Sequence, residues 1–124
     1  MSSTIAAYIY AVCAALPIAM QIALAFGAPL GRFANGGRFE GKLPPVWRAL
    51  AVLQGVLLAG MAWIVLDRAG IVEVGLPPLL FWIALGLTVL TTIANAASPS
   101  RPERLTWTPV TVVMSLSGLA VALL

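Results

Sequence analysis

Residues 2–31 read SSTIAAYIYAVCAALPIAMQIALAFGAPLG and contain no charged side chain. Roughly 20 apolar residues, each rising about 1.5 Å, cross the hydrocarbon core of a bilayer. The stretch is therefore long enough to cross a membrane with polar ends to spare. It lacks the basic start of a secretory signal peptide, and its apolar run is longer than such a peptide carries. We expect a retained transmembrane helix.

Charged residues divide the rest of the chain into three more uncharged segments, 49–66, 74–100 and 105–124. Two of them are short, but proline suits the first position of a helix, so Pro45 starts one helix early. The sequence Ser100-Arg101-Pro102-Glu103 predicts a capping box that starts another. We therefore predict an all-α membrane protein of four transmembrane helices, packed as a small up-down bundle. It forms one domain over residues 1–124, with spans at about 5–28, 45–66, 75–97 and 101–124.

The composition supports this class: 61% of the residues are hydrophobic and 9% are charged, against roughly 25% charged in soluble domains. Histidine, the commonest metal ligand and neutral-pH base, is absent. The single Cys13 permits no disulfide within the chain. We expect neither a metal nor another cofactor.

The basic residues predict the orientation of the bundle. Six of the seven flank the first or the third connector, and only Arg68 lies in the second. The positive-inside rule places the first and third connectors in the cytoplasm of a bacterial inner membrane, with both termini outside. The charge is thus explained by topology, and no nucleic-acid partner is expected. The residues expected to contact lipid headgroups are Arg32, Arg38, Lys42 and Arg48.

The first connector contains Asn35-Gly36-Gly37, a strong turn signal because these residues tolerate positive φ. Phe33 and Phe39 flank the turn. We expect a connector anchored at the interface by its aromatic side chains, and the alternative is a small hairpin that lies against the membrane surface.

Three amide side chains, Gln21, Gln54 and Asn95, lie within or at the edge of spans. Amides at membrane depth usually form hydrogen bonds between helices, which is the interpretation we favour. The alternative is that they line a ligand pocket.

The densest polar cluster follows Asn95 and runs to Pro109. In it, Glu103 is expected to cap a helix start, and an arginine to pair with it or with lipid phosphate. The alternative is an anion or headgroup site where guanidinium groups and free helix amides converge. The remaining candidate binding residues are Ser98, Ser100, Arg101, Glu103, Arg104 and Trp107.

Small residues repeat every four positions in two spans, as Ala51-Gly55-Ala59 and as Ala11, Ala15, Ala19 and Ala23. Such stripes allow helix backbones to approach closely in lipid. We predict that these two stripes pack together.

No catalytic set emerges, since all four carboxylates lie at span ends or in connectors. The two cytoplasmic connectors nevertheless resemble a widespread group of small, uncharacterised bacterial four-helix membrane proteins. The resembling residues are Gly27-Ala28-Pro29, Gly31-Arg32, Gly36-Gly37-Arg38, Leu43-Pro44-Pro45 and Arg48, then Asn95, Ser98-Pro99-Ser100, Glu103-Arg104, Trp107 and Pro109. The resemblance implies a fold and a shared polar region but no activity. Phe39 stands where a histidine or tryptophan is expected, which weakens a catalytic interpretation of that loop.

The favoured function is a non-enzymatic membrane protein that binds a lipid-like or small apolar ligand, or a partner protein. Its expected partners are membrane lipids, further copies of itself or a membrane partner protein. The alternative is a small transporter or channel subunit acting as a homo-oligomer, and behind it a lipid-modifying enzyme with Glu103 and Asn95 as first candidates.

Overall fold

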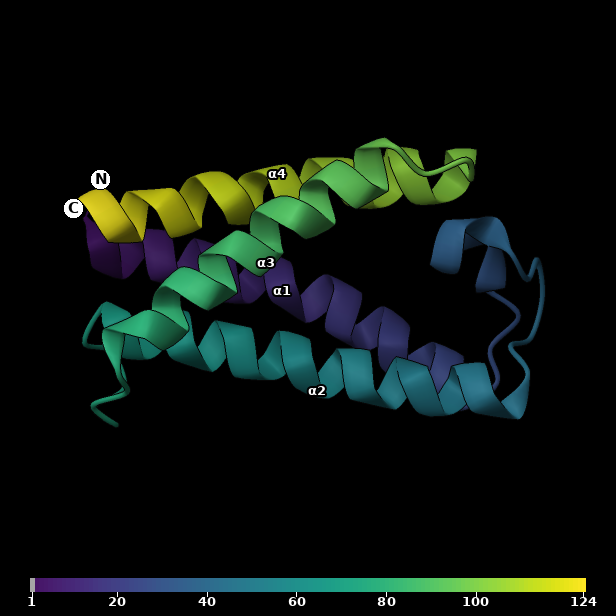
Figure 1. The fold of residues 1–124 in the computed structure, drawn as a ribbon, viewed down its shortest axis with the longest axis horizontal. Coiled ribbons are helices and arrows are strands. Elements are labelled where there is room, and N and C mark those ends of the chain that lie inside the picture. Colours follow the sequence, from purple (N-terminus) through teal and green to yellow (C-terminus); the bar gives the residue numbers. More distant parts are fainter. Residues whose placement is uncertain (1) are drawn as a thin grey trace.

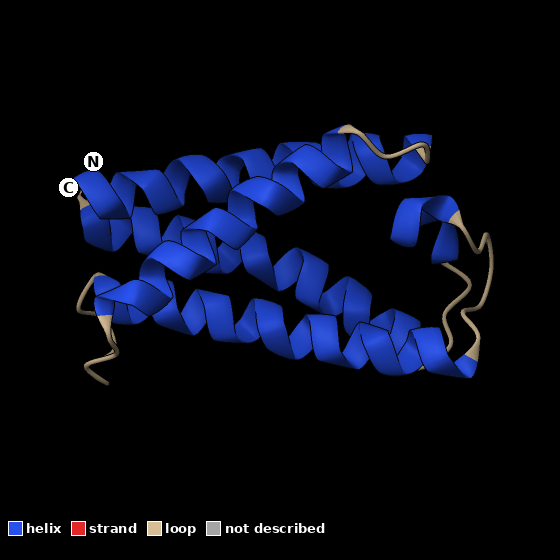
Figure 2. Cartoon of the chain, viewed as in Figure 1, coloured by secondary structure: helices blue, strands red, loops and turns tan. Residues whose placement is uncertain are grey.

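The computed structural model describes residues 2–124 as four long α-helices joined by loops, two short 3-10 turns and no strand in that range (Figures 1 and 2). The elements are α1 (Ser3–Ala25), η1 (Gly31–Phe33), η2 (Asn35–Gly37), α2 (Pro45–Arg68), α3 (Pro78–Ala96) and α4 (Arg101–Leu123). Each of the four long helices is long and apolar enough to cross a membrane. The predicted all-α fold of four transmembrane helices is confirmed.

The helices run alternately up and down, so both termini lie at one end of the bundle (Figure 1). Helix α1 packs against both α2 and α4, and α3 packs mainly against α4. Helices α2 and α3 come together near the loop that joins them and then diverge toward the end that holds η1 and η2 (Figure 1). The bundle therefore splits at that end into an α1–α2 pair and an α3–α4 pair.

The core forms where the helices cross in the half nearer the termini. Tyr10, Val65, Phe81 and Met114 come from four different helices, and each is at most 2% exposed. Gly118 lets α4 approach closely, because a Cβ atom at that position would lie 3.0 Å from Leu85 Cδ1. A second cluster, Leu24, Ala34, Leu43 and Ala51, packs the first connector onto α1 and α2.

Helix α1 ends at Ala25, three residues before the predicted end of the first span. Gly27 takes a φ of +90°, which is the left-handed region. Its N–H donates to Leu24 O and the Ala28 N–H donates to Ala23 O, both at 3.0 Å. These two bonds form a Schellman motif, and the glycine therefore stops the helix.

Helix α3 begins at Pro78 rather than at residue 75. The Asp67 carboxylate accepts N–H hydrogen bonds from Val74, Gly75 and Leu76 at 2.8, 2.9 and 3.0 Å. These bonds hold 74–76 as a loop against the end of α2. Proline at the first helical position then starts α3.

The predicted pairing of small-residue stripes is wrong for α1. Ala15 and Ala19 are exposed, and the buried face of that helix carries Ala6, Ala7, Tyr10 and Ala14. Alanine occurs on several faces of α1, so spacing alone did not identify the packed one. On α2 the prediction holds in part, because a Cβ atom on Gly55 would lie 3.4 Å from Gln21 Cβ.

Candidate functional site

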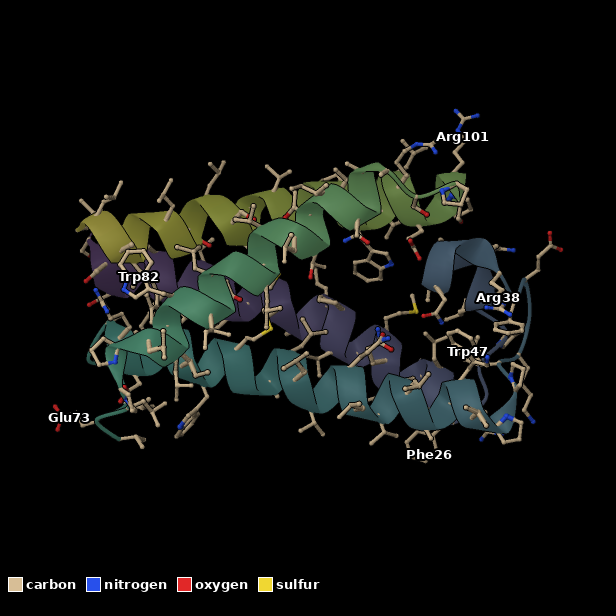
Figure 3. All side chains as sticks on the ribbon, viewed as in Figure 1. Phe26, Arg38, Trp47, Glu73, Trp82 and Arg101 are labelled. Atoms are coloured by element: carbon tan, nitrogen blue, oxygen red, sulfur yellow. The ribbon has the colours of Figure 1, made fainter. Side chains whose placement is uncertain are left out.

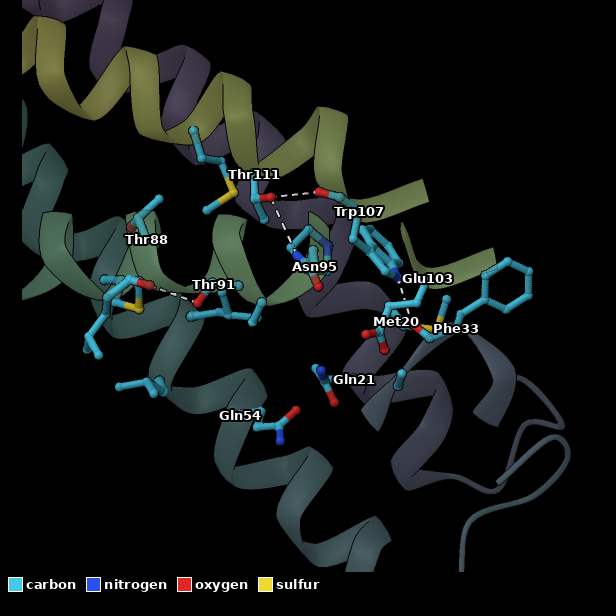
Figure 4. Close-up of a pocket in the computed structure, with 18 of the residues that line it drawn as sticks. Met20, Gln21, Phe33, Gln54, Thr88, Thr91, Asn95, Glu103, Trp107 and Thr111 are labelled. Atoms are coloured by element: carbon cyan, nitrogen blue, oxygen red, sulfur yellow. Dashed lines mark hydrogen bonds between the residues drawn. The ribbon is translucent and has the colours of Figure 1, made fainter. Parts of the chain in front are cut away.

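A pocket of about 360 Å³ lies between the α1–α2 pair and the α3–α4 pair, at the end of the bundle that holds the first connector (Figure 4). Its walls are mainly apolar, with side chains from all four helices. The apolar lining comprises Pro17 and Met20 of α1, Leu57, Leu58 and Met61 of α2, Leu87 and Ala94 of α3, and Met114 of α4. The surface is thus suited to the apolar part of a ligand.

The three amides that the sequence placed at membrane depth all line this pocket. Gln21 comes from α1, Gln54 from α2 and Asn95 from α3 (Figure 4). Asn95 Nδ2 donates to Thr111 Oγ1 at 3.4 Å, which is a bond between helices. Among the residues that the structure describes, Gln21 and Gln54 have no hydrogen-bond partner for their side chains. Asn95 therefore makes the expected bond between helices, and Gln21 and Gln54 line the pocket without such a bond.

Glu103 is buried at 8% exposure and also lines the pocket (Figure 4). The capping box that starts α4 is only half formed. Ser100 Oγ accepts the Glu103 N–H at 3.4 Å, but the Ser100 N–H donates to Ser98 Oγ at 3.1 Å. Since Ser98 takes the place of the glutamate, the Glu103 carboxylate accepts a 3.2 Å bond from the Gly36 N–H instead.

The first connector closes one end of the pocket. Phe33, Ala34 and Asn35 contribute to its lining. Trp107 Nε1 donates to Phe33 O at 2.9 Å, and Ser100 Oγ donates to Arg32 O. The connector does not form the surface hairpin that was the alternative expectation: its two 3-10 turns pack between the helix pairs, and Ala34 is buried.

The predicted turn itself is confirmed. Asn35, Gly36 and Gly37 have φ values of +53°, +69° and +72°. A Cβ atom on Gly37 would lie 2.7 Å from Ser100 Cβ, so this turn sits tightly against the start of α4.

Four other predicted site residues lie outside the lining of the pocket. Arg104 Nη1 donates to Ser98 O at 2.8 Å, so these two residues and Ser100 build the start of α4. Arg101 is exposed and points away from the bundle (Figure 3). The guanidinium group of Arg104 is thus engaged by Ser98 O, and the alternative of an anion site at this helix start stays a prediction.

The basic residues of the first connector lie on its outer surface. Arg32, Arg38 and Lys42 are exposed. Arg38 Cζ lies 5.6 Å from the ring centre of Phe39 and 5.1 Å from that of Trp47. Arg38, Trp47 and Arg101 mark this end of the bundle in Figure 3, and Glu73 and Trp82 mark the other.

Arg48 is half-buried. Its Nε donates to Ala25 O at 2.9 Å, so it satisfies a carbonyl at the end of α1 in addition to any contact with lipid.

The pocket opens between α2 and α3. Only three of its lining residues are exposed, namely Leu57 of α2 and Thr91 and Ala94 of α3. These are the two helices that diverge in Figure 1. Both helices are long and apolar enough to cross a membrane.

Sequence reasoning missed the threonines of α3. Thr88 and Thr91 line the pocket on the same helix as Asn95. Their spacing of three and then four residues places all three on one face of a helix, and that spacing was the signal available. Within residues 2–124, no group of three or more His, Cys, Asp or Glu is placed to hold a metal ion.

No protein-family model matches the chain, and no curated protein or solved structure matches it either.

Proposed function

We propose that the chain is a non-enzymatic, multi-pass protein of the bacterial inner membrane that binds a lipid-like or small apolar ligand in the pocket between its helices. One observation carries the proposal: Gln21, Gln54, Asn95 and Glu103 come from four different helices and line one largely apolar pocket. Ligand pockets typically combine an apolar lining with a few polar groups that orient the ligand.

The position of the opening supports a ligand that arrives from the bilayer. The exposed lining residues Leu57, Thr91 and Ala94 belong to membrane-spanning helices, and the connector covers the end of the pocket. A ligand dissolved in lipid can therefore reach the site without passing through water. The exposed Arg32, Arg38 and Lys42 lie in the same connector, where they are suited to contact anionic headgroups.

Mass spectrometry of the purified protein tests this proposal. The filling variant is Leu57→Trp, which places an indole in the pocket. The control is Leu53→Trp, one helical turn away on α2, where the native side chain is 62% exposed and does not line the pocket. Wild type and the control should retain a copurified lipid-like molecule, and the filling variant should lose it.

Two results would count against binding as the function. One is wild-type protein with no bound molecule after gentle extraction. The other is solute flux in proteoliposomes by protein that carries no ligand, which would favour the alternative of a transporter or channel subunit acting as a homo-oligomer.

A further inference from the structure

We propose, on the basis of the function proposed above, that the polar end of the ligand is a primary ammonium group held by Glu103 and by amide oxygens of the pocket. The ligand class is then an amphiphile with an alkyl tail and a protonated amine. Phosphate and carboxylate headgroups would be disfavoured.

The first argument is the charge of the pocket. Among the described residues that line the pocket, Glu103 is the only one with an ionisable side chain. The basic side chains at this end do not line the pocket: Arg48 donates to Ala25 O, Arg104 donates to Ser98 O, and the exposed Arg32 has its Cζ 5.0 Å from the ring centre of Phe33. The interior therefore attracts cations, although the outer surface of the same connector is basic.

The second argument is the unused bonding capacity of Glu103. An ionised carboxylate offers about four acceptor sites. In the described part of the chain, the Gly36 N–H is the only donor to this carboxylate, at 3.2 Å. A buried charge is costly unless it is paired and hydrogen-bonded. A cationic hydrogen-bond donor in the pocket supplies both the opposite charge and the hydrogen bonds.

The third argument is the number of neighbouring acceptors. Gln21 and Gln54 each present a carbonyl oxygen that no described residue engages. Asn95 uses its Nδ2 atom toward Thr111, which leaves its Oδ1 atom for a ligand. An ammonium group carries three N–H donors, so one carboxylate oxygen and two amide oxygens satisfy it completely.

The alkyl tail of the proposed ligand is inferred from the apolar part of the pocket lining. The apolar lining extends from Met20 to Met61 and Met114, and the opening lies beside Leu57 and Ala94. An alkyl chain can occupy this surface and leave between α2 and α3 into the bilayer.

The test uses dodecylamine, dodecanol and dodecanoate, which share one tail and differ in the head, together with dodecyltrimethylammonium, which has the charge without N–H donors. Each is titrated into the purified protein in an uncharged detergent, and binding is measured by calorimetry. We expect dodecylamine to bind most tightly and dodecanoate most weakly. Glu103→Gln should reduce the preference for the amine over the alcohol by about tenfold or more, the size expected for a hydrogen bond to a charged group.

The matched control is Glu40→Gln, which removes an equal charge from an exposed position of the first connector, outside the pocket lining. It should keep the preference of the wild type. If Glu103→Gln does not fold, the double variant Gln21→Leu/Gln54→Leu retains the carboxylate and should weaken the amine several-fold.

Three outcomes would overturn the ammonium proposal while binding itself stands: equal affinity for amine and alcohol, preference for dodecanoate, or equal affinity for the primary and trimethylated amines. If none of the four probes binds and no molecule copurifies, the proposed function fails with it.

Discussion

Tyr10 of α1 and Thr88 of α3 are joined by a 2.6 Å hydrogen bond between the two helices. Thr88 gives its single hydroxyl proton to Ala84 O at 2.7 Å, so Tyr10 is the donor. Both side chains are buried, and Thr88 also lines the pocket. The bond therefore ties α1 to α3 at a residue that lines the pocket.

Removing this bond should destabilise the bundle. We expect Tyr10→Phe to lower the free energy of unfolding by about 0.5–1.5 kcal/mol, because it leaves the Thr88 oxygen without its donor. Unfolding of the detergent-solubilised protein by dodecyl sulfate measures the change. Tyr8→Phe is the control, since Tyr8 is 53% exposed. Equal effects of the two substitutions would contradict the assignment.

The connector should not tolerate a side chain at Gly31. A Cβ atom there would overlap Phe39 O and lie 2.6 Å from Gly41 O, both backbone atoms. We expect Gly31→Ala to cost roughly 1–3 kcal/mol through overpacking and to speed cleavage of the connector by trypsin. Gly41→Ala, which meets nothing within 4 Å, should behave as wild type. If trypsin cuts the two variants at the same rate, the close packing of the connector at Gly31 is contradicted.

The opening between α2 and α3 should control ligand entry. Ala94→Trp places a large ring at the opening, and we expect dodecylamine to associate several-fold more slowly in stopped-flow fluorescence. The neighbouring Ile93→Trp is the control, because Ile93 is 59% exposed and lies outside the pocket lining. Unchanged rates in Ala94→Trp would place the entrance elsewhere.

The orientation predicted from the basic residues can be tested by labelling cysteines in a Cys13→Ser background. A membrane-impermeant maleimide should label Glu73→Cys from the outer side of the inner membrane in spheroplasts. It should label Glu40→Cys only after the membrane is permeabilised, because the positive-inside rule places the first connector in the cytoplasm. The reverse pattern would invert the topology.

The ends of the helices show which structural features short stretches of sequence could predict. Ser100 as the cap of α4 and Pro45 as the start of α2 were predictable, because caps and prolines act through their nearest neighbours. The start of α3 was not. It depends on the Asp67 carboxylate reaching 74–76, a loop contact that no spacing rule describes.

In the candidate site, too, some features were predictable from the sequence and others depend on the tertiary structure. Gln21, Gln54 and Asn95 were singled out because amides are uncommon at membrane depth. That they share one pocket with Glu103 depends on how the four helices are rotated and crossed. Likewise, the expected capping role of Glu103 is taken by Ser98, and the contact of Glu103 with Gly36, 67 residues away, was not predictable.

The sequence by itself determined that four helices are long and apolar enough to cross the membrane, because lipid offers no hydrogen-bond partner to the backbone and charged residues lie only in the connectors and at the helix ends. Only the tertiary structure decided which helix faces meet. Each helix is apolar on most sides, and lipid is as apolar as a protein core, so hydrophobicity does not distinguish the packed face. Close packing and a few bonds between helices, such as Tyr10 to Thr88, make that choice, and the pocket between the helix pairs follows from it.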